Sequence, residues 1–496
     1  MFCLFLAFVY LRFLLLNGYG SLAIRCRLAK HAYADKVPEM KMTLMQDHAW
    51  LNARCKAARE ANIIKPTPAI SISRMFYLLC SLLFATSTLV AADLSGDWEF
   101  AAKYLGDFNY ARVTLKIEEG KLTGTLNELK LEGSLKGGEL TFSATRPNGK
   151  HFGDFTGKVS GDQLEGTGEW ADDRKITWSA KRAAIPPHTP RVHDFEPKEF
   201  HRVFSDAIAP VLHIFPGDTV RTWTVDAGGV DSNNVRRSLG GNPQTGPFYV
   251  EGAFPGDTLV VKLSRVRLNR DSAGSGNQIM YSALTPSYVQ RTKYDDKFNS
   301  TWVLDREKGV ARLKEPSEHL KNYTVKLQPM LGCIAVAPPG HQAFRTGFLG
   351  SYGGNMDYNQ IREGTTVYFP VNAPGALLFL GDGHAAQGDG ELTGDALETS
   401  MQVEFTVNLI KGESTRNPRA ENDDYLMSLG IANSLPEAVQ SATTELAKWI
   451  ERDYKLEPNE VAIVLGTAIQ YNIAELVDPL VHVVAKIPKD ALAKLK

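Results

Sequence analysis

Short stretches of alternating apolar and polar residues, separated by glycine turns, dominate the chain after residue 93. Between residues 94 and 182 they recur at intervals of roughly 8–12 residues, as in ARVTLKIEEG, KLTGTL and DQLEGTGEW. A period of two directs every second side chain toward a core, and no helical period interrupts these stretches. The pattern predicts a mainly β fold in which residues 93–182 form a small all-β domain, built as a meander, sandwich or barrel.

No catalytic cluster stands out in residues 93–182, so we interpret them as a structural accessory domain, with a binding or docking barrel as the alternative. The following segment, AAIPPHTPRV at 183–192, holds three prolines in ten residues. Proline stiffens a linker, so this segment predicts a domain boundary.

A second β-rich region begins at residue 193. FPGDTVRTWTVDA at 215–227 and FPGDTLVVKL at 254–263 share one plan, a Pro-Gly-Asp-Thr turn followed by a strand. Proline presets such a turn, glycine takes a positive φ, and the aspartate and threonine bond the turn backbone.

The period changes near the C-terminal end. SLPEAVQSATTELAKWIERDY at 434–454 begins with a capping-box pair and then places its apolar residues on one helical face. PNEVAIVLGTAIQYNIAEL at 458–476 reads as a second helix. We expect the preceding β domain to be a sandwich or barrel. Both helical segments should pack on it and contribute no catalytic residues.

The first 92 residues differ from the rest. FYLLCSLLFATSTLVAA at 76–92 is an apolar run ending in small residues, which is the pattern of a secretory signal peptide beginning at Met75. We therefore expect residues 75–92 to be a signal peptide and residues 1–74 to be an over-long gene prediction or a disordered leader. The alternative is a membrane anchor at 1–16. The expected product is exported, periplasmic or secreted, without stable membrane insertion.

Composition narrows the classes of partner. A net charge of −1 implies no basic face, which argues against nucleic acid as a partner. Of five cysteines only Cys333 follows the expected cleavage point, so the mature chain has no internal disulfide.

GDGHAAQGDGE, residues 381–391, follows the apolar run ALLFL and gathers ligand-type side chains among four glycines. Carboxylate and amide oxygens and imidazole nitrogen are the ligands that divalent cations prefer. We expect these glycines to fold a tight loop at the end of a strand. His384, Gln387 and Glu391 are candidate metal ligands.

Three further acidic residues are candidates from their local patterns. Asp357 follows a Gly-Gly-Asn turn in GSYGGNMDYN and suits a ligand or a base. Glu251 interrupts the apolar strand TGPFYVEGAF, and a buried carboxylate needs a partner, which makes it a candidate catalytic base. Asp226 ends a strand and is a candidate ligand.

TGPFYVEGAFPGDTL, PMLGCIAVAPP, GGNMD and VNAPGALLFLGDGHAAQGDGE, in this order, closely resemble the acetamidase/formamidase family over residues 193–490. The resemblance implies hydrolysis of short linear amides such as formamide or acetamide, a β-rich fold, and zinc or calcium in the site. It also suggests a homo-oligomer. By the same resemblance Asp357 and His384 are the foremost functional residues, followed by Gln387, Glu391 and Glu251.

The chain also departs from the family pattern. A Gly-Gln pair is expected soon after Asp226, but the sequence there reads DAGGVDSNNVRRSLGGN. This difference favours the alternative of a lactamase or other amide hydrolase on the same scaffold. A non-catalytic protein that binds a metal or ligand is a separate alternative, which the intact GDGHAAQGDGE and GGNMD motifs argue against.

Overall fold

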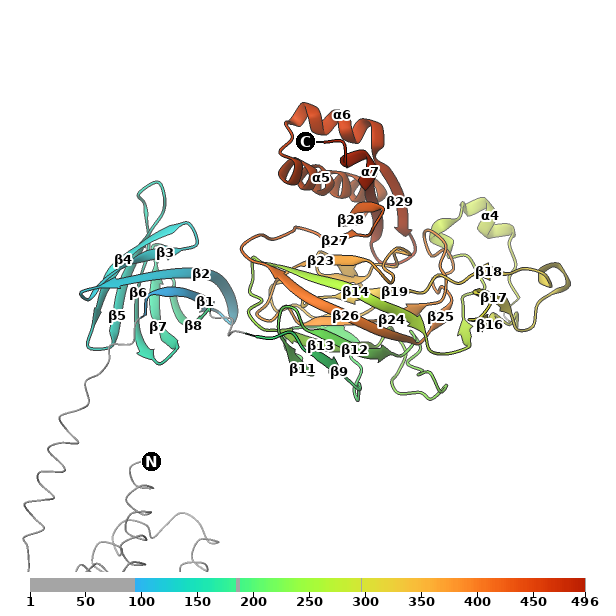
Figure 1. Ribbon diagram of the computed structural model, residues 1–496, viewed down its shortest axis with the longest axis horizontal. Coiled ribbons are helices and arrows are strands. Elements are labelled where there is room, and N and C mark those ends of the chain that lie inside the picture. Colours follow the sequence, from blue (N-terminus) through green and yellow to red (C-terminus); the bar gives the residue numbers. More distant parts are fainter. Residues whose placement is uncertain (1–93, 184–187, 296, 496) are drawn as a thin grey trace, which may run out of the picture. The chain divides into compact units, whose positions relative to one another are not determined.

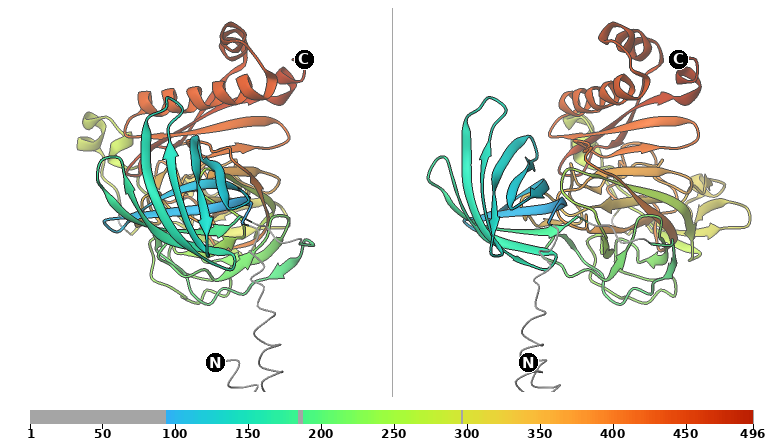
Figure 2. Two further views of the ribbon diagram at one scale, coloured as in Figure 1. Left: turned by 90° about the vertical axis from the view of Figure 1, so that its left-hand side faces the viewer. Right: turned by 60° about the vertical axis from the view of Figure 1, so that its left-hand side comes forward.

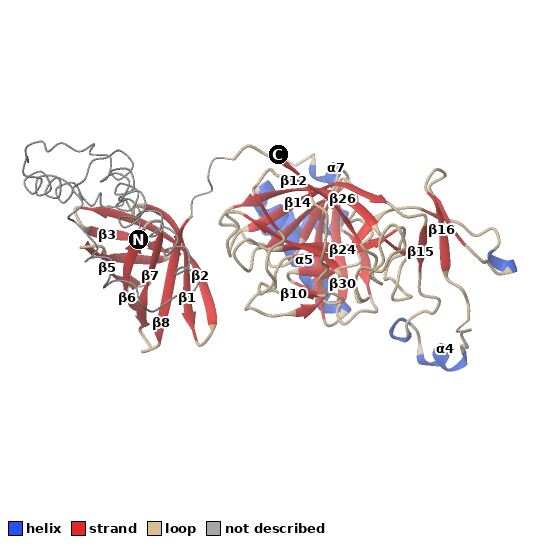
Figure 3. Ribbon diagram, turned by 90° about the horizontal axis from the view of Figure 1, so that it is seen from below, coloured by secondary structure: helices blue, strands red, loops and turns tan. Residues whose placement is uncertain are grey.

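The computed structural model describes residues 94–183, 188–295 and 297–495. The expected leader and signal peptide lie outside this range, as does part of the proline-rich linker. Strands dominate the described chain and helices are few (Figure 3), which confirms the predicted mainly β class. None of the helices in the described ranges has both the length and the apolar character needed to span a bilayer.

The first described unit of structure is a closed antiparallel barrel of eight strands, seen in Figures 1 and 2. Each strand pairs with its neighbour in sequence, and β1 also pairs with β8 to close the ring. The alternating positions point inward and form a core of their own. The strands are β1 (Gly96–Tyr104), β2 (Asp107–Glu118), β3 (Lys121–Leu126), β4 (Leu129–Lys136), β5 (Glu139–Thr145), β6 (His151–Ser160), β7 (Gln163–Trp170) and β8 (Lys175–Arg182).

The chain after the linker builds two large sheets around a second core. The nine-stranded sheet has the order β29-β30-β28-β27-β23-β14-β26-β12-β9. Its strands are β9 (Val192–Asp194), β12 (Thr219–Thr224), β14 (Thr258–Leu268), β23 (Thr366–Pro370), β26 (Met401–Ile410), β27 (Arg419–Glu421), β28 (Tyr425–Ala432), β29 (Gln470–Glu475) and β30 (Val481–Pro488).

The eleven-stranded sheet carries most of the candidate site. Its main path runs β18-β17-β16-β15-β25-β24-β19-β22-β21, and β13 joins β24 to β11 beside that path. Its strands are β11 (Leu212–Ile214), β13 (Gln244–Val250), β15 (Ser272–Gly274), β16 (Thr301–Asp305), β17 (Val310–Leu313), β18 (Val325–Lys326), β19 (Met330–Ala335), β21 (Leu349–Gly350), β22 (Gly353–Asn355), β24 (Leu378–His384) and β25 (Glu398–Thr399). A separate pair joins β10 (Val203–Phe204) to β20 (Phe344–Arg345).

Both Pro-Gly-Asp-Thr turns form as the sequence predicts. The carboxylate of Asp218 accepts the backbone N–H of Phe215 at 3.1 Å, and that of Asp257 accepts the N–H of Phe254 at 3.0 Å. The threonine that follows each aspartate begins a strand, β12 or β14.

The C-terminal helices only partly match expectation. Helix α5 (Leu435–Tyr454) begins at the predicted cap, Ser434, and packs on β28 and β30 (Figure 1). Helix α6 (Pro458–Ala468) stops well before residue 476, because Gln470–Glu475 pairs with β30 as strand β29. The remaining helical elements are α4 (Pro286–Arg291), α7 (Lys489–Leu492), η1 (Tyr281–Ala283) and η2 (Glu318–Leu320).

Candidate functional site

The stretch 381–391 is partly a strand, which corrects the expectation of a loop directly after ALLFL. Strand β24 continues through His384 and pairs with β19 on one side and β25 on the other. Every residue of β24 is buried. The two glycines on β24 therefore serve close packing: a Cβ added to Gly383 would lie 2.3 Å from Cγ of Met401, and one added to Gly381 would lie 2.8 Å from Nε2 of Gln244.

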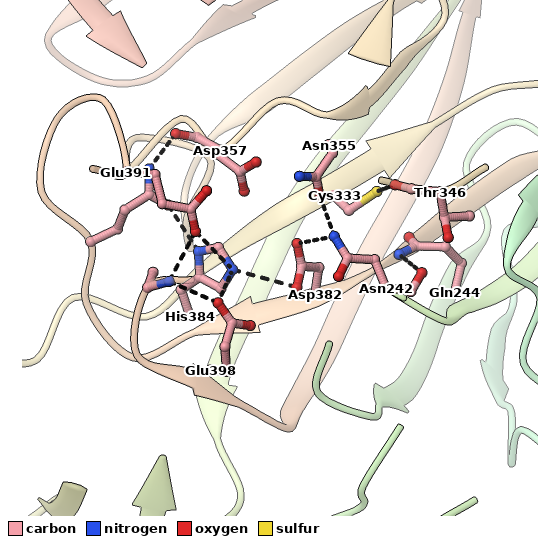
Figure 4. Close-up of polar contacts among 12 residues, drawn as sticks. Asn242, Gln244, Cys333, Thr346, Asn355, Asp357, Asp382, His384, Glu391 and Glu398 are labelled. Carbon is pink, nitrogen blue, oxygen red and sulfur yellow. Dashed lines mark hydrogen bonds and ion pairs between the residues drawn. The ribbon is translucent and has the colours of Figure 1, made fainter. Parts of the chain in front are cut away.

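His384 ends β24 and faces a group of carboxylates in the interior (Figure 4). Its Nε2 lies 3.1 Å from Oε1 of Glu398 and 3.4 Å from Oδ1 of Asp382. Oε1 of Glu391 is 4.0 Å from the same nitrogen. Burial alone would lower the pKa of His384, but the carboxylates of Glu398 and Asp382 raise it well above its ordinary value.

Gln387 fixes the orientation of the imidazole. Its Nε2 donates to the backbone carbonyl of Asp357 at 2.5 Å, which leaves its Oε1 to accept from Nδ1–H of His384 at 2.8 Å. With the proton on Nδ1, the Nε2 lone pair of a neutral imidazole points at the carboxylates. That arrangement is repulsive unless Nε2 carries a proton or contacts a cation.

Asp357 follows β22 and Asp382 lies on β24, so the two approach the imidazole from the two strands that flank β19. Both carboxylate oxygens of Asp357, and Oδ1 of Asp382, are buried without a hydrogen-bond partner. Both residues have positive φ, +44° and +57°, which is uncommon outside glycine and concentrates at functional sites. Gly332 lies between them on β19, and its lack of a side chain makes room for both carboxylates.

Three groups of side chains bring their ligand atoms within 4.8 Å of one another in this region. Three residues, His384, Asp357 and Glu391, each belong to two of these groups. The groups are Asp357–Asp382–His384, His384–Glu391–Glu398 and Asp357–Glu391–Glu475.

The cluster holds more carboxylates than one imidazole can balance. Burial, then the charges of Glu391 and Asp382, raise the pKa of Asp357 well above its ordinary value. Burial also raises the pKa of Glu398 to about 8 and that of Asp478 to about 7. Unpartnered buried oxygens around an imidazole nitrogen are the donor set that suits zinc or calcium, so the residues fit a divalent cation.

Side-chain amides border the carboxylates on one side. Nδ2 of Asn242 donates to Oδ1 of Asn355 at 2.6 Å and to Oδ2 of Asp382 at 3.1 Å. Nδ2 of Asn355 in turn donates to Oδ2 of Asp478 at 2.6 Å. The divergent segment 226–242 therefore reaches the cluster through its last residue.

The predicted site residues divide into two sets. Asp357, His384, Gln387 and Glu391 lie together in the cluster, whereas Glu251 and Asp226 make their contacts elsewhere. Glu251 is half-buried, and its Oε1 lies 2.7 Å from Nδ1 of His213. Asp226 pairs with the buried guanidinium of Arg270 at 2.6 Å. Each thus has a hydrogen-bonding partner outside the cluster.

Sequence reasoning did not select several members of the cluster. Asp382 stands in the quoted stretch, so the ligand-rich motif could have marked it. Glu398, Asn242 and Asp478 carry no local signal. Glu475 was assigned to a helix without chemistry, but β29 places it opposite the cluster, where its Oε2 is buried and unpartnered.

Known proteins are similar to the part of the chain that holds the cluster. Residues 339–493 match the model of the Acetamidase/Formamidase family, a range that contains every carboxylate and the imidazole of the cluster. A formamidase from Methylophilus methylotrophus is 26% identical over 266 residues, which is 43% of this chain and 64% of the relative. The chain thus spans less than two thirds of the length of the curated relatives it matches.

Two solved structures share the fold of the region. A predicted acetamidase/formamidase from Thermoanaerobacter tengcongensis has a TM-score of 0.53 at 27% identity, covering 62% of this chain and 99% of the other. An acetamidase from Yersinia enterocolitica has a TM-score of 0.52 at 29% identity, covering 62% and 94%.

Proposed function

We propose that the chain, which is similar to the acetamidase/formamidase family, hydrolyses the C–N bond of short linear amides and releases ammonia and a carboxylate. One observation carries the proposal: the buried imidazole of His384 faces the carboxylates of Asp382, Glu391 and Glu398, and several carboxylate oxygens of the cluster have no hydrogen-bond partner. Uncompensated buried charge of this kind is costly for the fold and is typical of a reaction centre.

His384, Glu391 and Glu398 would hold a divalent cation, since their ligand atoms lie within 4.8 Å of one another. When bound, such a cation supplies Lewis acidity, which weakens an amide by drawing electron density from its carbonyl oxygen. Both polar atoms of Gln387 already have protein partners. We therefore assign Gln387 the task of orienting His384 rather than that of a ligand.

Asp357 is our candidate for proton transfer. Neither of its carboxylate oxygens is bound to a protein donor, and its pKa is raised by burial and by the neighbouring charges of Glu391 and Asp382. A carboxylate in this state can accept a proton from the attacking water and return it to the amide nitrogen, so that ammonia leaves instead of an amide anion. Glu251, the other candidate base, is occupied by His213 and contacts none of these residues.

The test is a substrate panel with the cation-loaded protein. We expect ammonia from formamide, acetamide or propionamide, and a fall of at least about a hundredfold in kcat/KM for His384→Ala. His151→Ala, an exposed histidine of the barrel, serves as the control and should leave turnover unchanged. Ring opening of a γ-lactam without turnover of linear amides would favour the lactamase alternative. Cation binding without any turnover would favour the non-catalytic one.

A further inference from the structure

The eight-stranded barrel contains a cavity of about 430 Å³. All the residues that line it belong to the barrel, between Phe100 and Trp170. This cavity is open to the outside at one end of the barrel, where exposed residues such as Asn109 and Glu128 line it. The mouths of small barrels are a common place for small-molecule sites.

The cavity arises from small side chains on two neighbouring strands. In the register of β1 and β2, Ala111 stands opposite Phe100 and Asn109 stands opposite Ala102. Deeper in the barrel the inward positions of the same strands are filled by Trp98 and Leu115, both buried. The barrel is therefore closed by large side chains at depth and open where β2 begins.

Aromatic rings form the wall that faces these small residues. Phe155 is buried, and Phe152 and Trp170 lie half-buried nearer the mouth with ring centroids 6.4 Å apart. The faces of these two outer rings are covered by cations at the rim: Arg146 lies 5.1 Å from the Phe152 centroid and Arg174 lies 4.4 Å from that of Trp170. The wall therefore offers apolar ring surface on the inside and positive charge only outside.

Charge inside the cavity is nearly absent. No lysine, arginine or histidine lines it, and its one ionisable carboxylate, Glu128, is exposed at the β3–β4 turn. An anionic ligand would have no cation to pair with inside, and Arg174 at the rim already pairs with the carboxylate of Asp172 at 2.7 Å. A cationic ligand would meet the guanidinium groups of Arg146 and Arg174 at the rim. The amide of Asn109 is the polar group available to a bound molecule on the inward face of β2.

We propose that the barrel binds an uncharged aromatic compound of two or three rings, packed against the half-buried rings of Phe152 and Trp170 beside Ala111 at the mouth of the barrel. Aromatic side chains prefer offset or edge contacts with other rings, and these contacts add to the energy of burial. The proposal concerns the barrel alone and does not depend on amide hydrolysis.

The test uses a pair of fluorescent probes that differ in charge. The uncharged probe is N-phenyl-1-naphthylamine, and the anionic one carries the same rings with an added sulfonate. In titrations of the full chain we expect saturable binding of the uncharged probe and binding at least about tenfold weaker for the sulfonate. Naphthalene should displace the uncharged probe, whereas 1-decanol should not.

Variants locate the site. Ala111→Phe fills the cavity and should weaken the uncharged probe at least about tenfold, whereas Ala171→Phe adds the same ring at an exposed turn and should not. Asn109→Phe acts from the exposed mouth and replaces Ala111→Phe if that protein does not fold. Binding that survives both cavity variants, equal binding of the sulfonate, or displacement by decanol as efficient as by naphthalene would each overturn the proposal.

Discussion

Gly332 determines how closely the carboxylates and imidazole of the site can approach one another. A Cβ at this position would lie 2.5 Å from Oδ1 of Asp357, 2.7 Å from Cε1 of His384 and 2.8 Å from Oδ2 of Asp382. Real Cβ atoms do not approach other heavy atoms so closely, so the added methyl group must push functional side chains apart.

Gly332→Ala should therefore disable the site without unfolding the protein. We expect kcat/KM for acetamide to fall at least about a hundredfold, because displacements near 1 Å disrupt reacting geometry. Gly347→Ala is the matched control, since a Cβ there meets no atom within 4 Å. Unchanged turnover in Gly332→Ala, with both proteins folded by circular dichroism, would contradict the geometry described here.

Asn242 links the divergent segment 226–242 to the site through its bonds to Asn355 and Asp382. Asn242→Ala leaves Oδ1 of Asn355 without this donor, and we expect kcat/KM to fall about tenfold or more. Asn233→Ala, an exposed residue of the same segment, should have no effect. Steady-state kinetics on acetamide decide the matter; equal values for the two variants would show that Asn242 has no positioning role.

At the scale of residues, sequence reasoning selected some residues that lie together in the cluster and did not select others, among them Glu398, whose Oε1 lies 3.1 Å from Nε2 of His384. The motif 381–391 identified His384, Gln387 and Glu391 because ligand-type side chains among glycines are a local signal. Glu398 and Asn242 come from distant segments and are brought in only by strand pairing. Glu251 and Asp226 carried local signals as well, but each makes its contact outside the cluster, with His213 or Arg270, and no local pattern reveals that partner.

Among the secondary-structure elements, the first Pro-Gly-Asp-Thr turn is tied to the end of the linker. The buried carboxylate of Asp218 lies 2.6 Å from Nε2 of His188 and 2.8 Å from Nε2 of His193, and it accepts the N–H of Arg191 at 2.8 Å. Burial would raise the pKa of Asp218, but the bonds from His193, Arg191, Phe215 and His188 lower it to about 2.

This pKa predicts an acid-dependent loss of stability. Because the folded value is about 2 and an unfolded aspartate titrates near about 3.9, the ionised Asp218 stabilises the fold above pH ~4, and this contribution is lost as the pH falls toward 2. Asp218→Asn should lower the free energy of unfolding by about 1–2 kcal/mol at pH 7. This difference from the unmodified protein should shrink below pH ~4.

Urea denaturation at several pH values measures the difference in the free energy of unfolding between Asp218→Asn and the unmodified protein. Asp194→Asn is the control because its carboxylate is largely exposed, so its effect should be small at every pH. A cost for Asp218→Asn that does not change between pH 7 and pH 2.5 would contradict the assigned pKa.

The elements themselves were predictable where a local period was clear. The turn residues and the cap at Ser434 forecast β12, β14 and α5 correctly. The segment 470–475 was taken for helix because its apolar residues continue those of α6. It is a strand because its backbone pairs with β30, a tertiary interaction that overrides local propensity.

On the scale of the whole molecule, the candidate site and the barrel have separate cores and separate hydrogen-bonded sheets. All the side chains of the cluster come from residues 242–478, so none belongs to the barrel. A protein lacking residues 94–182 should therefore retain kcat/KM for acetamide within about threefold. A folded but inactive shortened protein would show that the barrel contributes to catalysis.

The central claim is that the cluster around His384 hydrolyses amides with the help of a divalent cation. The most direct measurement is ammonia release from acetamide by chelator-treated protein before and after zinc or calcium is restored, in parallel with Glu398→Gln. We predict that turnover is lost on chelation, returns with one of the cations, and returns only weakly in Glu398→Gln, which removes one carboxylate of the proposed ligand group. Undiminished turnover after complete removal of bound metal would contradict the account.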